Sequence, residues 1–107
     1  MDMEKRAHPR VDKTFPVVIH LPKYEQNIKT INVSIGGAAI CHSQKYYRTN
    51  QLICLELLIS EGNSIITDAR IRWISPTSID AKMYKLGIEF VGMSDADKEK
   101  LKAAIKG

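Results

Sequence analysis

Two arginines near the start of the chain, Arg6 and Arg10, form the first pattern with a recognisable chemistry. Pro9 has a fixed φ angle and no backbone N–H, so it keeps His8 away from helical angles and predicts an extended or turning loop. Each guanidinium is a permanently charged planar fork that can bind a phosphate, or the O6/N7 edge of guanine, with two hydrogen bonds. The pair therefore indicates an anion grip, although the same spacing is also typical of solvated basic tails.

A second polar cluster follows a strand-like run and ends in the glycines Gly36 and Gly37. Asn32 and Ser34 precede them, two residues apart, so in an extended chain their side chains share one face. An amide and a hydroxyl on that face could bind a base edge, and the glycines permit positive φ and close approach of a ligand. The alternative is turn chemistry, in which Asn and Ser bond their own backbone.

Together with two later segments, these clusters resemble the PilZ domain, a family of bacterial receptors for cyclic di-GMP. The family pattern is R-x-x-x-R, then D/N-x-S-x-x-G, then an A-x-V/I-x-W strand and a G-I/V-x-F strand. All four occur here in that order, the last two at residues 69–73 and 87–90. The resemblance covers nearly the whole chain.

The resemblance implies a receptor and not an enzyme, with cyclic di-GMP as the ligand and no cofactor or metal. Arg6 and Arg10 would bind the phosphates and guanine, Asn32 and Ser34 would bind a guanine edge, and Gly37 would leave room for the ligand. Asn32 stands where many members have Asp, and one neutral amide oxygen is a weaker acceptor than a carboxylate. The expected ligand-binding residues are Arg6, Arg10, Asn32, Ser34, Gly36 and Gly37.

Two secondary candidates come from the same resemblance, Lys5 and Trp73. In the family, the residue before the first arginine is associated with binding of one ligand or a stacked pair, and the cation of Lys5 favours the pair. Trp73 is expected to be a core or rim aromatic residue. In some PilZ domains, however, the matching tryptophan lies near the ligand and could stack on guanine.

Strict alternation along residues 64–75 predicts which side chains share the face of Trp73. The inward set is Ile65, Thr67, Ala69, Ile71 and Trp73. The outward set is Ile66, Asp68, Arg70, Arg72 and Ile74.

The whole pattern predicts a mainly β protein, a small six-stranded antiparallel barrel with a short C-terminal helix. Strands are expected near residues 15–21, where Phe15, Val17, Ile19 and Leu21 alternate with more polar residues, and at 27–34, 38–43, 51–59, 64–75 and 83–91. No helical pattern long enough for a parallel crossover separates them, and closure into a barrel removes exposed edges. We expect a flexible basic arm at 1–13, the barrel at 14–93 and the helix at 94–107.

The C-terminal segment carries a helix-start signal. Ser94 is an N-cap candidate with Asp97 in the first turn, and Leu101, Ala104 and Ile105 recur at helical spacing. The apolar face is expected to cover an open end of the barrel or, alternatively, to contact a partner.

The amino-acid composition further limits the kinds of protein and partner that are possible. The 107 residues and 44% hydrophobic content suit one domain, and the net charge of +4 favours an anionic partner without choosing it. Cys41 and Cys54 lack C-x-x-C spacing and are expected to be buried free thiols, and the scattered histidines suggest no metal site. No apolar run approaches a membrane span of about 20 residues, so we expect a cytoplasmic protein.

Tyr46 and Tyr47 lie between Lys45 and Arg48, which resembles an aromatic and basic RNA-binding surface. A solvated loop is the preferred interpretation, because no strand motif for RNA binding accompanies these residues. Nucleic acid is therefore not an expected partner.

The predicted mechanism is that cyclic di-GMP orders the N-terminal arm over the barrel and that the changed shape is passed to an effector protein. The effector could belong to motility, exopolysaccharide, chemotaxis or transcription machinery. Three alternatives remain: an adaptor with weak or no nucleotide binding, a small-barrel RNA-binding module, and a structural interaction domain.

Overall fold

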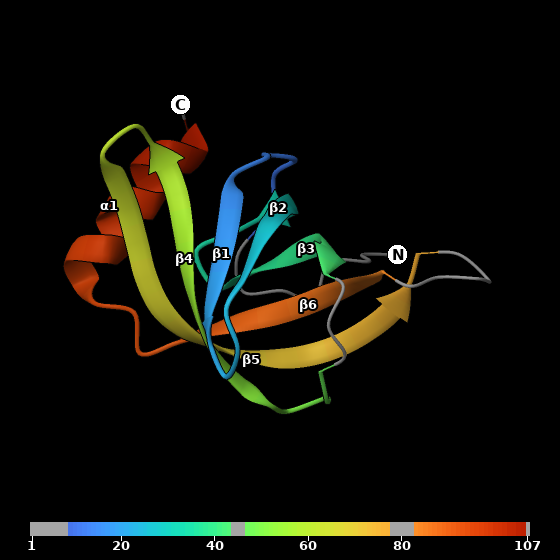
Figure 1. Cartoon of the computed structure of the whole chain (residues 1–107). Helices are drawn as coiled ribbons and strands as arrows, with labels where there is room; N and C mark the ends of the chain where they lie inside the picture. Colours follow the sequence, from blue (N-terminus) through green and yellow to red (C-terminus); the bar gives the residue numbers. More distant parts are fainter. Residues whose placement is uncertain (1–8, 44–46, 78–82, 107) are drawn as a thin grey trace.

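The computed structural model describes residues 9–43, 47–77 and 83–106. It confirms the predicted fold class, a closed antiparallel barrel of six strands with one C-terminal helix (Figure 1). The elements are β1 (Pro16–Leu21), β2 (Glu25–Val33), β3 (Gly37–Ser43), β4 (Leu52–Ser60), β5 (Asn63–Pro76), β6 (Tyr84–Val91) and α1 (Asp95–Lys106).

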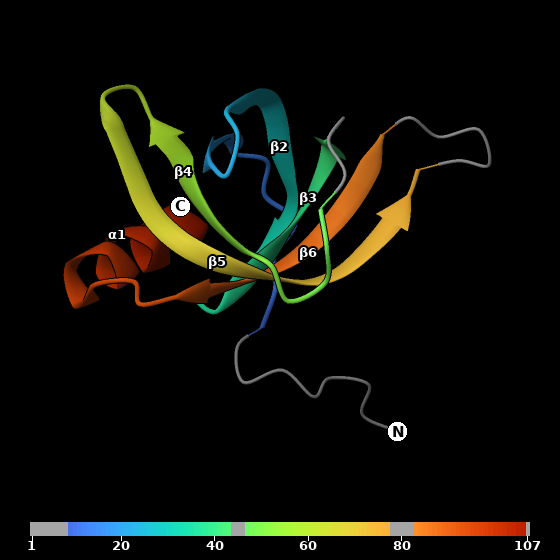
Figure 2. The same ribbon diagram turned by 60° about the horizontal axis from the view of Figure 1, so that its bottom comes forward.

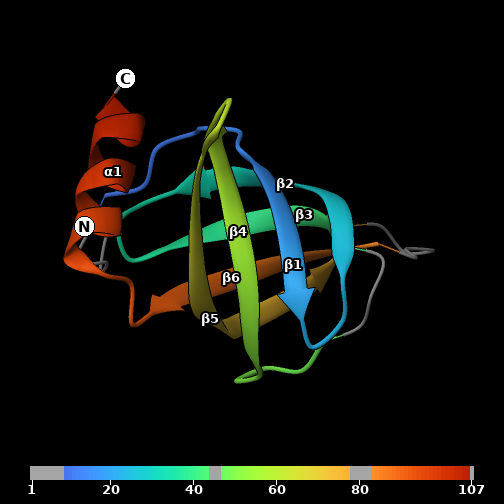
Figure 3. The same ribbon diagram turned by 60° about the vertical axis from the view of Figure 1, so that its left-hand side comes forward.

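Around the barrel the strands follow the order β1-β2-β3-β6-β5-β4. Strand β5 is 14 residues long, and its first half pairs with β4 while its second half pairs with β6. Its curvature is visible in Figure 2, and Figure 3 shows β1 and β4 crossing in front of β3 and β6. Closure pairs both edges of the sheet, so no open edge is left to aggregate.

The inward side chains of the strands fill one apolar core. In β1, Val17 and Ile19 are buried as alternation predicts, and Phe15 just before the strand is buried too. The inward placement expected for Leu21 is wrong, because this side chain is 60% exposed. The pairing of β1 with β4 shifts register between Ile19 and Leu21, and such an irregularity breaks the period of two.

A second irregularity corrects the expected faces of β5. Ile71 is buried, but the register against β6 shifts between Ile71 and Trp73, and Trp73 is 42% exposed. Ile74, expected to point outwards, is instead partly buried against the core. The outward positions of Arg70 and Arg72 are confirmed, because Arg70 is partly exposed and the Arg72 side chain is 49% exposed.

The expected solvated loop around Tyr47 is also wrong. Tyr47 is 2% exposed and belongs to the core, and its hydroxyl donates a 3.0 Å hydrogen bond to Glu25 Oε1. Burial and the nearby negative charge of Glu25 raise the pKa of Tyr47 far above its ordinary value. Tyr46 and Lys45 lie outside the described residues.

Helix α1 begins as predicted, with Ser94 Oγ accepting a 3.1 Å hydrogen bond from the N–H of Asp97. Leu101 is completely buried in the core, and Ala104 and Ile105 are partly buried against it. Lys100 Nζ donates to the carbonyl of Ser64 at 3.3 Å, which fixes the helix beside the β4–β5 hairpin. The predicted covering role of this helix is therefore confirmed.

The thiols are free, as expected, but only Cys41 is fully buried. Cys54 is partly exposed, and burial together with the charge of Asp68 raises its pKa. His20 bonds Glu56 Oε1 at 2.9 Å, as a satisfied strand histidine would. Among the described residues, no helix has the length and apolar content needed to cross a membrane.

Within the expected arm 1–13, residues 10–13 are hydrogen-bonded to the barrel. Val11 pairs with Val33 through two backbone hydrogen bonds of 3.0 and 2.9 Å. The carbonyl of Lys13 accepts a 2.6 Å hydrogen bond from the Thr30 hydroxyl. Arg6 and Lys5 lie in residues 1–8, outside the described part of the chain.

Candidate functional site

The Val11–Val33 bridge brings two predicted site residues together. Next to it, Arg10 Nη1 donates a 3.1 Å hydrogen bond to Asn32 Oδ1. Both side chains are partly buried, and Asn32 lies on the outside of β2, because its neighbour Val33 points into the core. A cation is thereby held by a neutral amide on the outer surface of the barrel.

Ser34 closes the turn that follows β2. Its Oγ accepts hydrogen bonds from the N–H groups of Gly36 and Gly37, both at 3.2 Å, and its own N–H donates to the Gly37 carbonyl at 2.8 Å. The residue is 4% exposed. The turn-chemistry interpretation is thus confirmed for Ser34, while its contact with a ligand stays a prediction.

Packing inside the barrel, without any ligand, explains why residue 37 is a glycine. A Cβ added at Gly37 would lie 2.2 Å from the carbonyl oxygen of Ile88, so the close approach of β6 requires a glycine. Among the described glycines, the positive φ angles belong to Gly62 and Gly92, and the positive φ suggested for the glycine pair is not observed. The turn is also fixed to β6 by a 2.9 Å bond from the Phe90 N–H to the Gly36 carbonyl.

One row of residues crosses four strands beside Arg10. Asn32 on β2 pairs with Ala39 on β3, Ala39 pairs with Gly87 on β6, and Gly87 pairs with Trp73 on β5. With neighbouring strands about 4.8 Å apart, the row extends about 14 Å. We call this row, with Arg10, the outer face.

The indole of Trp73 lies across Gly87. A Cβ at Gly87 would lie 2.0 Å from the indole Nε1, so only a glycine accepts the ring there. Ala39, the next small side chain in the row, is 4% exposed. The outer face therefore has a guanidinium and an amide at one end and a large aromatic ring at the other end. The two small residues between them, Ala39 and Gly87, are buried.

Sequence reasoning missed the small residues of the outer face. Gly87 was noted only as part of a motif, although a glycine inside a strand is a known signal of close approach by another group. Ala39 carried no comparable signal. Trp73 was kept as a candidate because of the family resemblance, and its role stays a prediction. Its exposure depends on the register shift.

A polar cluster borders the aromatic end of the outer face. Arg72 donates from Nε to Glu89 Oε1 at 2.7 Å and from Nη1 to Asn50 Oδ1 at 3.2 Å. Arg70 Nη1 donates to the backbone carbonyl of Asn50 at 3.0 Å. No sequence signal indicated this cluster, because its two strands and one turn come together only in the closed barrel.

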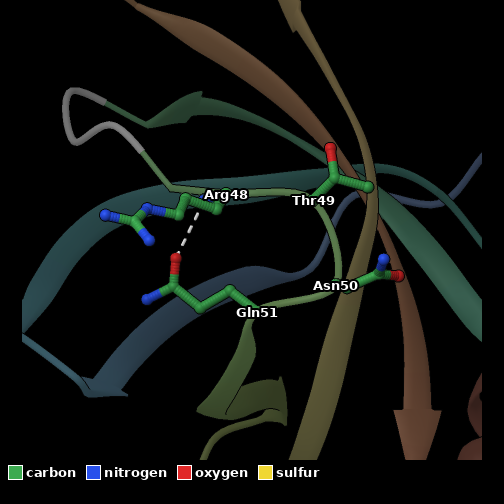
Figure 4. Close-up of a pocket in the computed structure, with 4 residues that line it drawn as sticks. All are labelled: Arg48, Thr49, Asn50 and Gln51. Atoms are coloured by element: carbon green, nitrogen blue, oxygen red, sulfur yellow. Dashed lines mark hydrogen bonds between the residues drawn. The ribbon is translucent and has the colours of Figure 1, made fainter.

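Two pockets lie near these residues. One, of about 600 Å³, is lined by the turn Arg48, Thr49, Asn50 and Gln51, in which the Arg48 N–H donates to Gln51 Oε1 at 2.8 Å (Figure 4). The other, of about 380 Å³, lies between the Ser34–Gly37 turn and the start of α1, and its lining includes Glu89 and Lys98. Within the described residues, no group of three or more His, Cys, Asp or Glu side chains is arranged to hold a metal ion.

Comparison with known proteins gives one family and several similar structures. The family model described as "PilZ domain" matches residues 4–107. An uncharacterized protein of Aquifex aeolicus (strain VF5) is 26% identical over 92 residues, which are 86% of this chain and 43% of that protein. The chain therefore spans less than half the length of this curated relative.

Three solved structures share the fold. The Bacillus subtilis inhibitor of motility MotI/DgrA has a TM-score of 0.81 at 19% identity, over 97% of this chain and 50% of that one. The PilZ domain of Escherichia coli YcgR with c-di-GMP has a TM-score of 0.75 at 14% identity, over 96% and 90%. The K. pneumonia MrkH–c-di-GMP complex has a TM-score of 0.78 at 16% identity, over 94% and 51%.

Proposed function

This chain belongs to the PilZ domain family, and from that premise we propose that it is a receptor for cyclic di-GMP. Proteins of this family are receptors for the dinucleotide rather than enzymes. The observation that supports the proposal most strongly is the outer face, which joins Arg10 and Asn32 to Trp73 through Ala39 and Gly87.

The outer face suits a ligand that has both anionic phosphates and flat bases. The guanidinium of Arg10 carries a permanent positive charge, and this charge attracts the two phosphates of the ligand. A base can stack on the exposed indole of Trp73. Asn32, beside Arg10, supplies an amide for a second base edge.

The turn of Ser34, Gly36 and Gly37 contributes mainly as a fixed boundary of the outer face. Its hydrogen bonds to itself and to β6 keep the backbone close to Asn32. In this proposal the two glycines allow the ligand to approach the backbone closely, and the Ser34 hydroxyl maintains the turn that contains them.

The proposed response to the ligand is movement of the segment before Arg10. Because residues 10–13 are already bonded to the barrel, ligand-induced ordering would concern residues 1–8 and would bring Arg6 onto the phosphates. Lys5 would then favour a stacked pair of ligands. Hydrogen exchange of residues 1–8 tests this step, and exchange rates unchanged by saturating ligand would contradict it.

The output proposed for this receptor is contact with an effector protein in the cytoplasm, in motility, exopolysaccharide, chemotaxis or transcription machinery. A second candidate is an adaptor with weak or no nucleotide binding. The observation in its favour is that Ser34 Oγ and Asn32 Oδ1 already accept hydrogen bonds inside the protein.

Binding measurements on Arg10→Ala separate the two functions. For a receptor, the variant should lose most of the affinity for cyclic di-GMP, because it loses a charge-assisted contact to the ligand. Arg48→Ala is the matched control, since Arg48 is an exposed arginine outside the outer face. If Arg10→Ala bound as tightly as the parent protein, the proposed site would be wrong.

A further inference from the structure

The register shift in β5 turns two consecutive side chains outwards. Ile71 before them is buried and Ile74 after them is partly buried, whereas Arg72 and Trp73 are both exposed. In a regular strand one of the two would point inwards. Bulges of this kind are known to re-aim side chains next to functional sites, so the local geometry brings a cation beside the aromatic ring.

The Trp73 ring and the Arg72 guanidinium lie over neighbouring outward positions of β6. The indole of Trp73 covers Gly87, and the guanidinium of Arg72 is bonded to Glu89. Outward positions two residues apart on a strand are about 7 Å from each other. A base stacked on the indole would therefore have an edge within reach of the Arg72 guanidinium.

Arg72 is held from two sides. Glu89 on β6 accepts from its Nε and Nη2, and Asn50 accepts from its Nη1. Asn50 itself is held by the backbone, because its N–H donates to the Ile71 carbonyl at 2.6 Å. Within the part of the chain that the structure describes, these bonds use three of the five N–H donors of the guanidinium, and two are left by count.

We propose that Arg72 is a specificity-determining residue that binds the O6/N7 edge of a guanine stacked on Trp73, and that Asn50 is its positioning residue. The inference rests on the proposed function, since it assigns a selectivity contact to the same ligand face. Guanine offers two acceptors, O6 and N7, to an arginine fork. Adenine offers N7 and an amino donor, and a donor facing the guanidinium costs binding.

The test compares affinities for cyclic di-GMP and cyclic di-AMP in the purified full-length chain by calorimetry. Arg72→Ala should weaken the binding of cyclic di-GMP about tenfold or more and leave the binding of cyclic di-AMP unchanged or slightly stronger, so that the selectivity ratio falls. Arg72→Gln should lower the ratio further, because a glutamine amide pairs with the N6/N7 edge of adenine. Asn50→Ala should lower the ratio less than Arg72→Ala, since it removes only one of the bonds that hold the fork.

Arg70→Gln is the matched control. Arg70 is an outward arginine on the same strand that also bonds Asn50, but it pairs with Glu89 one row away from Trp73. This variant should keep the parental ratio, and circular dichroism should show that every variant is folded.

An unchanged ratio in both Arg72 variants, with tight binding by the parent, would overturn this inference and leave the receptor function intact. Absence of cyclic di-GMP binding by the parent would instead overturn the proposed function, and the inference would fall with it. An equal loss of affinity for cyclic di-GMP in the Arg70 and Arg72 variants would also overturn the inference, because it would reveal a general effect of removing positive charge.

Discussion

Arg10 and Asn32, 22 positions apart in the sequence, are joined by a hydrogen bond of 3.1 Å on the outside of the barrel. The adjacent backbone bridge between Val11 and Val33 fixes both residues. The protein alone therefore places the second arginine of the R-x-x-x-R motif on the outer face. Such preorganisation lowers the entropy that binding must overcome.

Replacing Asn32, which accepts a hydrogen bond from Arg10, by a carboxylate should strengthen the site. Asn32→Asp turns the bond from Arg10 into an ion pair and offers guanine a second acceptor oxygen, and we expect cyclic di-GMP to bind tighter by about 1 kcal/mol, roughly fivefold. Calorimetry measures this change, with cyclic di-AMP as the control ligand. Weaker binding of cyclic di-GMP by the variant would show that repulsion from the phosphates outweighs both gains.

Gly37→Ala should destabilise the barrel strongly. The new Cβ would meet the Ile88 carbonyl oxygen at 2.2 Å, and a paired backbone cannot move aside, so we expect a loss of about 2–3 kcal/mol in the free energy of unfolding. Gly62→Ala is the control, because its φ of 72° is unfavourable but nothing lies within 4 Å of the added carbon. Denaturant titration should give the control a smaller loss, about 1 kcal/mol. A larger loss for Gly62→Ala would refute the steric explanation.

The Tyr47–Glu25 contact predicts a loss of stability at alkaline pH. The pKa of Tyr47 is raised in the folded state, first by burial and then by the charge of Glu25. Its contribution to stability is therefore fully present below the unfolded pKa of about 10 and is lost as pH rises from there towards the folded value. Tyr47→Phe should show a shallower decrease in the free energy of unfolding between pH 9 and pH 11.

Tyr24→Phe is the matched control for this measurement, since the Tyr24 side chain is 58% exposed. It should follow the parental pH profile. At neutral pH, Tyr47→Phe should cost about 1–2 kcal/mol, because Glu25 loses a buried hydrogen bond. Parallel profiles for Tyr47→Phe and the parent would contradict the assigned environment of Tyr47.

The lowered pKa of Glu56 predicts a loss of stability at acidic pH. Hydrogen bonds from Ser64 and then from His20 lower its pKa in the folded state. The stabilisation is present above the unfolded pKa of about 4.5 and is lost as pH falls through the lowered value. Glu56→Gln should therefore lose less unfolding free energy than the parent between pH 5 and pH 2, whereas Glu61→Gln, on the exposed β4–β5 turn, should behave like the parent.

Alternation and turn residues were sufficient to predict the barrel, because β1, most of β4 and the first part of β5 keep a period of two. The prediction failed where a register shift interrupts the period, at Leu21 and after Ile71. These shifts arise when strands are bent to close the barrel, and nothing local in the sequence specifies them. Tyr47 was missed for a related reason: its polar neighbours conceal a ring that fills the core and bonds Glu25, which lies in a distant strand.

The candidate site was predicted only in outline. The family pattern indicated Arg10, Asn32 and Trp73, but not that Asn32 and Trp73 share one row across four strands. The roles of Ala39 and Gly87 depend on the side chains that cover them. Such contacts between distant strands become visible only once the register is known.

Titration of the purified chain with cyclic di-GMP, and in parallel with cyclic di-AMP, by isothermal calorimetry tests the central claim most directly. The account predicts saturable binding of cyclic di-GMP, at least about tenfold tighter than cyclic di-AMP, because the O6 acceptor and the N2 donors belong to guanine alone. The stoichiometry decides between one ligand and a stacked pair. Absence of binding at any accessible concentration, or equal binding of both dinucleotides, would contradict a guanine-selective receptor.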